Sequence, residues 1–186
     1  MNKRYFQLFL FNMLALCTFA QSPAPIIKSG TTVNYTFILH GQTRKMDITY
    51  AFNSDSVRLD WSLNSDTGTY MVTPEGWKNG NVLSFQQPEP QQTIVLKPSE
   101  TFAFISVKAF NDLLSKHSFV YSNTTYTLKE GGSDKFIIDG HEWAVMHVLA
   151  EVDATEMWIL NNPTLPLICK TIKSPLGINF SISSLK

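Results

Sequence analysis

Alternation of apolar and polar residues with a period of two most constrains the fold of this chain. In residues 33–39 every second side chain is apolar or aromatic, and residues 46–52 and 57–63 repeat the pattern. The polar residues 53–56 form a turn signal between the last two segments. Such alternation is typical of antiparallel strands that bury one face and expose the other.

The rest of the chain adds further short strand candidates and one helix. Residues 139–140 are Asp-Gly, a strong hairpin signal between two apolar segments. In residues 106–117 the apolar side chains recur at helical spacing, and Ser106 can cap the first turn. The chain therefore predicts a β-rich α+β fold. We expect one strongly curved antiparallel sheet, a half-barrel or clam of about ten strands, around a single main helix.

Three segments are predicted to be irregular. Residues 74–80 carry turn chemistry around Trp77, and residues 86–92 contain two prolines and are expected to form an extended surface loop. Residues 131–134, Gly-Gly-Ser-Asp, are expected to form a flexible link.

The first twenty residues have the pattern of a secretory signal peptide. Lys3 and Arg4 precede an apolar run, and residues 18–20 fit a small-x-small cleavage site. The alternative, a membrane anchor, is disfavoured because the apolar run is shorter than the roughly 20 residues that a spanning helix needs. We expect residues 1–20 to be removed, leaving residues 21–186 as a single antiparallel β-rich domain. Its location would be the periplasm or outer envelope rather than the extracellular medium.

Charge and cysteine content narrow the classes of partner. Cleavage would remove two of the fifteen basic residues and no acidic one, so the remaining chain is slightly acidic. No basic field for nucleic acid is expected, and no transmembrane segment remains after cleavage. Cys169 would be the one remaining cysteine, and its apolar neighbours predict a buried residue rather than a reactive thiol.

No catalytic signature is present in the sequence. Serine-elbow, zinc-protease, paired-cysteine and phosphate-loop motifs are all missing. A metal site would pair His147 with Glu151 or His141, but four or six residues along one strand span roughly 13–20 Å. A hydrogen-bonded strand histidine is the simpler interpretation of His147. We therefore expect no enzyme activity, no cofactor and no metal.

Aromatic residues are the one unusual feature of the composition. Two predicted strands, residues 102–105 and residues 143–146, are apolar on both faces, so something must cover each side. Packing of a protein core would explain this, and so would the wall of a cavity for an apolar ligand. Seven aromatic residues are candidates for such a wall: Tyr35, Phe37, Trp61, Phe104, Phe110, Trp143 and Trp158.

The order of these elements resembles the periplasmic lipoprotein carriers of LolA-like clam fold. The resemblance rests on an opening strand at 33–39, a hairpin at 44–63, the helix at 106–117 and a closing segment at 166–178. It implies a curved sheet that shelters acyl chains beneath a helical lid, although the lid of those carriers has several helices. The chain is also similar to uncharacterised bacterial secreted proteins of this size.

Two functions follow as hypotheses. The first is a non-enzymatic envelope protein that binds a lipid, an acyl chain or another hydrophobic small molecule on the concave face of the sheet. The alternative is an envelope scaffold or accessory protein that binds another protein through surface features such as Trp77 and the loop 86–92. A hydrolase with an unrecognised site is a third class, which would need converging catalytic groups.

Overall fold

The structure is a computed structural model and describes residues 25–186. The predicted signal peptide lies outside the described residues. Eleven strands of the described part form one sheet. They are β1 (Thr32–Leu39), β2 (Gln42–Phe52), β3 (Val57–Leu63), β4 (Asp66–Val72), β6 (Thr93–Val95), β8 (Ser118–Tyr121), β9 (Thr124–Ile138), β10 (His141–Ala150), β11 (Glu156–Leu160), β12 (Ile168–Ile172) and β13 (Ile178–Leu185).

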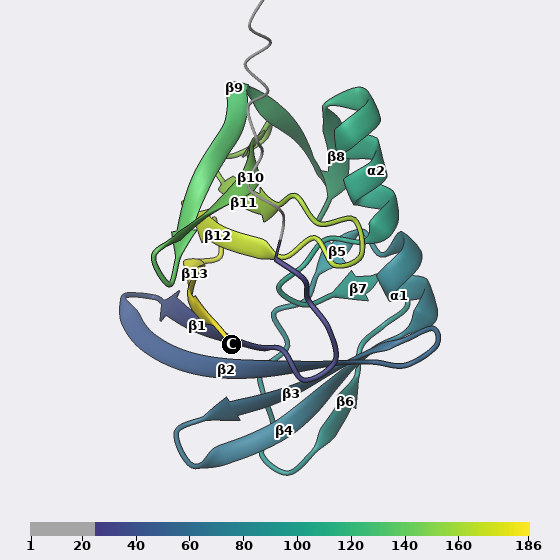
Figure 1. The fold of residues 1–186 in the computed structure, drawn as a ribbon, viewed down its shortest axis with the longest axis vertical. Coiled ribbons are helices and arrows are strands. Elements are labelled where there is room, and N and C mark those ends of the chain that lie inside the picture. Colours follow the sequence, from purple (N-terminus) through teal and green to yellow (C-terminus); the bar gives the residue numbers. More distant parts are fainter. Residues whose placement is uncertain (1–24) are drawn as a thin grey trace, which may run out of the picture.

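The sheet is open and strongly bent. Its strand order is β6-β4-β3-β2-β1-β13-β12-β11-β10-β9-β8, so β6 and β8 are its two edges. Neighbouring strands are antiparallel except for β4 and β6, which are parallel. Figure 1 shows β1 to β4 below and β8 to β12 above, with β13 where the sheet bends between them. The predicted curved sheet of about ten strands is therefore confirmed.

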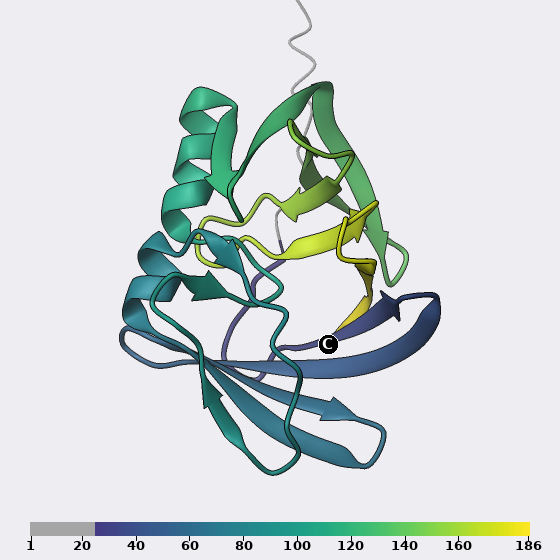
Figure 2. The ribbon, with the colours of Figure 1, turned by 180° about the vertical axis from the view of Figure 1, so that it is seen from behind.

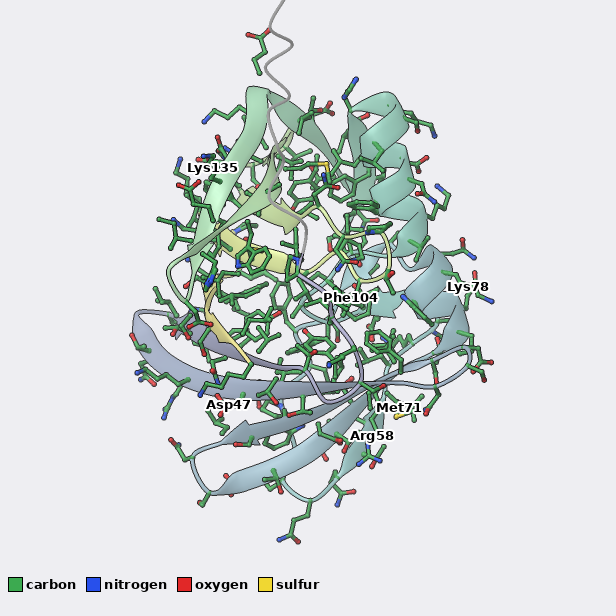
Figure 3. The ribbon with its side chains drawn as sticks, viewed as in Figure 1. Asp47, Arg58, Met71, Lys78, Phe104 and Lys135 are labelled. Atoms are coloured by element: carbon green, nitrogen blue, oxygen red, sulfur yellow. The ribbon has the colours of Figure 1, made fainter. Side chains whose placement is uncertain are left out.

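The inner face of the bend carries the core. On β1, Val33, Tyr35 and Phe37 are buried while the residues between them are partly exposed. The predicted alternation repeats on β2 and β3, where Ile48 and Leu59 are fully buried. Phe104 lies in the middle of the molecule, whereas Lys78 and Lys135 lie at its periphery (Figure 3). The space between the two halves of the sheet is thus largely filled by side chains.

Two helices lie on one side of the bent sheet, as Figures 1 and 2 show from opposite directions. The main helix α2 (Val107–Lys116) has the predicted limits, with Ser106 accepting a hydrogen bond from the Ala109 amide and His117 ending it in a left-handed conformation. Its side chains Phe110 and Leu113 are buried. Helix α2 contacts β8, and the short helix α1 (Pro74–Asn79) contacts α2.

Three local predictions are wrong. Residues 74–79 form α1 rather than a turn, because Thr73 caps the helix and Pro74 occupies its first turn. Residues 131–134 belong to the 15-residue strand β9 rather than to a flexible link. Residues 102–105 contribute only an isolated bridge between Phe104 and Leu167, next to the two-stranded sheet of β5 (Val82–Leu83) and β7 (Glu100–Thr101).

The hairpin prediction at Asp139 and Gly140 is confirmed. These two residues join β9 to β10, and both have positive φ angles, 51° and 76°. A two-residue turn of this kind matches the twist of the flanking strands. Among residues 25–186, neither helix is long and apolar enough to cross a bilayer.

Candidate functional site

The seven aromatic residues predicted to line a cavity do not form one surface. Tyr35, Trp61, Phe104 and Phe110 are at most 1% exposed and pack within the core. Trp143 and Trp158 are partly buried against it. Phe37, on β1, is 9% exposed and is the member of this set that lines the apolar pocket described next.

An apolar pocket of about 470 Å³ opens on the inner face of the sheet, at the ends of β1, β2 and β3. Its floor is made by side chains that share the inner face, and its roof is the segment 85–88 that follows β5. The apolar lining residues are Phe37, Leu39, Met46, Leu63, Phe85, Pro88, Phe102 and Ile178; the polar ones are His40, Arg44, Gln86 and Gln87. Its volume lies within the roughly 300–1,000 Å³ range of small-molecule pockets.

Strand register explains why these residues meet. Leu39 of β1 lies opposite Ile178 of β13, and Phe37 lies opposite Arg44 of β2. Residues opposite one another in a sheet point to the same face. The buried Phe37 and Met46 therefore place Leu39 and Arg44 on the inner face as well, where β1 and β2 run out toward solvent.

The roof of the pocket is fastened to the sheet. The Tyr70 hydroxyl donates to the Gln86 carbonyl at 2.7 Å, and the Gln91 amide donates to the Thr67 carbonyl at 2.7 Å. Burial raises the pKa of Tyr70, with a further contribution from the negative charge of Glu89. Tyr70 thus stays a neutral donor at physiological pH, and the loop that covers the pocket is held at both ends.

Gly68 allows the roof to come close. A Cβ at this position would lie 2.5 Å from the Trp61 ring and 2.9 Å from the Glu89 carbonyl oxygen. Any larger residue would have to displace backbone or a buried indole. The position of the segment 85–92 therefore depends on glycine at position 68.

The mouth of the pocket carries a cation. Arg44 is exposed and makes one side-chain hydrogen bond, donating to Gln42 Oε1 at 3.2 Å. His40 is in the turn between β1 and β2, and its backbone amide donates to the Gly177 carbonyl at 3.0 Å. No acidic residue is among those that line the pocket. The site is therefore apolar inside and basic at its opening.

A second cluster of polar groups surrounds the buried residue His147. Its Nδ1 lies 3.1 Å from Asp134 Oδ2 and its Nε2 lies 2.8 Å from Glu156 Oε2. Lys173 donates to the other oxygen of Glu156 at 2.7 Å, and the imidazole stacks on Trp158 at 4.1 Å between ring centroids. The hydrogen bond from Lys173, followed by that from His147, holds the pKa of Glu156 below its ordinary value although partial burial opposes this.

This cluster has the geometry of a structural clamp. Carboxylate oxygens only accept hydrogen bonds, so both bonds of His147 form together when each ring nitrogen carries a proton. Asp134 comes from β9, His147 from β10 and Glu156 from β11, so the side chains link three strands. The prediction that His147 is a hydrogen-bonded strand residue is confirmed.

Other groups capable of chemistry are enclosed or dispersed. Cys169 is fully buried, as predicted, and burial raises the pKa of its thiol. Within residues 25–186, no group of three or more histidine, cysteine or acidic side chains is arranged to hold a metal ion. The apolar pocket is therefore the best candidate site. Its Arg44 and its roof were not foreseen, because only the tertiary register brings them to Phe37.

Comparisons with known proteins return similarity in structure alone. No protein-family profile matches the sequence, and no curated protein matches it significantly. A crystal structure of MucB in complex with MucA(peri) is similar to this chain with a TM-score of 0.43 and 12% identity, covering 86% of this chain and 50% of that one. The complex structure of Pseudomonas aeruginosa MucA/MucB gives the same score and identity over 84% of this chain. The chain thus spans about half the length of the MucB chains that it matches.

Proposed function

We propose that this protein is an exported, non-enzymatic binding protein of the cell envelope that takes the apolar part of a lipid or acyl compound into the pocket beside Phe37. One observation carries the proposal: apolar side chains from β1, β2, β3 and β13, under a fastened roof, leave about 470 Å³ unfilled. Elsewhere the inner face is occupied by the core, so this pocket is the natural place for an apolar chain.

Burial of a chain is a sufficient driving force for such binding. Each methylene group transferred from water into an apolar pocket contributes about 0.8 kcal/mol. The ordered roof reduces the cost of association, because the segment 85–88 need not be fixed when the ligand arrives. No reactive group is required at any step.

Two adjacent residues of β1 provide a matched test. Leu39 lines the pocket, whereas Ile38 is 45% exposed on the opposite face. A Leu39→Trp substitution should fill the pocket and weaken the binding of a fluorescent fatty acid at least tenfold. The control Ile38→Trp adds the same ring outside the pocket and should leave binding unchanged.

Protein purified from its own host should also carry a bound mass in native mass spectrometry. A spectrum of ligand-free protein together with no displaceable fatty acid would reject the proposal. Equal behaviour of the two tryptophan variants would place any binding elsewhere.

A protein partner is the second candidate, and the free edge of the sheet is the observation that favours it. Strand β6 pairs with β4 on one side only, and its Val95 is 65% exposed. An extended segment of another protein could add to such an edge. Trp77, predicted to be an exposed contact, is instead half-buried in α1, with its indole N–H donating to the Thr164 carbonyl at 3.3 Å. In-cell crosslinking from position 95 would test this candidate.

A further inference from the structure

We infer that the ligand of the apolar pocket is a single-chain carboxylate, and that Arg44 binds its head group while the chain lies against Phe37. The inference rests on the proposed function and adds two properties to it, the charge of the head group and the number of chains. Both come from the lining of the pocket.

The pocket has a polar end and an apolar end. Met46 and Phe102 are 6% and 7% exposed and lie where the pocket meets the core. Gln86, Gln87 and Arg44 are exposed and lie at the opening. A ligand that matches this arrangement has an apolar tail and a polar head, with the tail inward.

Charge complementarity selects the sign of the head group. Arg44 is the one lining residue with a permanent charge, and no lining residue is acidic. It forms no ion pair with any side chain of residues 25–186. Its guanidinium has five N–H donors, and the bond to Gln42 uses one of them. The remaining donors match the two oxygens of a carboxylate in fork geometry.

The volume of the pocket selects the number of chains. A methylene group takes up about the same space as a water molecule in the liquid, roughly 30 Å³. The pocket of about 470 Å³ therefore accommodates one chain of about fifteen carbons. Two parallel chains of a membrane phospholipid would need about twice that space.

The test compares dodecanoate with dodecanol, which has the same chain and no charge. Both are titrated into the wild-type protein, Arg44→Gln and the control Lys45→Gln by displacement of a fluorescent probe. Lys45 is the next residue of β2, is also exposed and points to the opposite face. Each substitution removes one positive charge, so the two variants have the same net charge. Arg44→Gln should weaken dodecanoate binding about tenfold and leave dodecanol unchanged, since it removes a charge-assisted hydrogen bond. Lys45→Gln should change neither.

The outcomes separate this inference from the proposed function. Equal affinity of wild-type protein for the acid and the alcohol, or the same loss for both ligands in Arg44→Gln, would overturn the role of Arg44 while leaving apolar binding intact. Tighter binding to vesicles of a two-chain anionic phosphatidylglycerol than to dodecanoate would overturn the single-chain assignment. Failure of both ligands to bind wild-type protein would remove the proposed function itself. Arg44 is exposed, so an unchanged melting temperature should show that the variant is folded.

Discussion

The two halves of the sheet, β1 to β4 and β8 to β12, differ in how many of their faces are covered. In β1, β2 and β3 buried and solvent-facing residues alternate, so only the inner face is covered. In β10 the four consecutive residues 145–148 are all buried, so both faces are covered there. The first half therefore has a solvent-exposed polar outer face, and the pocket lies on its inner face. In the second half an enclosed polar side chain needs a partner within the protein, and His147 finds two, in Asp134 and Glu156.

Packing should differ between the halves in the same way. Phe110 of α2 is 1% exposed beside β8, whereas Leu39 is half-buried at the pocket. Phe110→Ala should lower the free energy of unfolding by about 3–5 kcal/mol, since it opens a cavity in a filled region. Leu39→Ala should cost about 1 kcal/mol, because the site already borders empty space. Urea unfolding measures both, and equal losses would show that the pocket side is packed as tightly as the helix side.

The His147 cluster should contribute less to the free energy of unfolding than a core residue such as Phe110, but more than a surface contact. His147→Ala leaves Glu156 with one partner fewer inside the sheet and should reduce the free energy of unfolding by about 2 kcal/mol. The control His141→Ala changes an exposed histidine on the same strand and should stay within about 0.5 kcal/mol of the wild type. A negligible effect of His147→Ala would mean that the second half does not depend on these polar bonds.

Acid should weaken the second half through Glu156. Because the pKa of Glu156 is lowered in the folded protein, the unfolded state binds protons more readily as the pH falls. The stabilisation is complete above the unfolded pKa of about 4.3 and is lost as the pH falls through the lower folded value. Chemical unfolding of wild-type protein and Glu156→Gln between about pH 3 and 6 measures the difference. The gap between the two should narrow toward acid pH; a gap that is constant with pH would contradict the assignment.

The regular elements could be predicted because their information is local. A period of two placed β1 to β3, and helical spacing with Ser106 as the cap placed α2. Helix α1 was missed because Pro74 and Gly76 also fit a turn, and only the capping bond from the Gly76 amide to Thr73 separates the two. Strand β9 was predicted as two pieces because its central glycines suggest a link. Pairing with β10 on both sides of the glycines joins the pieces into one strand, with a shift of register opposite the segment between Met146 and Val148.

The site could not be predicted because it depends on pairing between distant strands. Phe37 was among the predicted wall residues, but its neighbours Arg44, Phe102 and Ile178 come from three other segments. Similarly, the sequence suggests Glu151 and His141 as partners of His147 along one strand, whereas its actual partners Asp134 and Glu156 lie on the two neighbouring strands. Strand periodicity identifies the face of a residue, and only register identifies its neighbours.

The pairing of β1 with β13 has a consequence for how the molecule forms. The Ser183 hydroxyl donates to the Asn34 carbonyl across 149 positions of sequence, and β13 alone joins the two halves of the sheet. Contacts between such distant residues require the closure of a very long loop before they contribute any stability, which slows folding. Each half can therefore form early through pairing of strands that are close in sequence. The complete curved sheet forms only when β13 pairs with both β1 and β12.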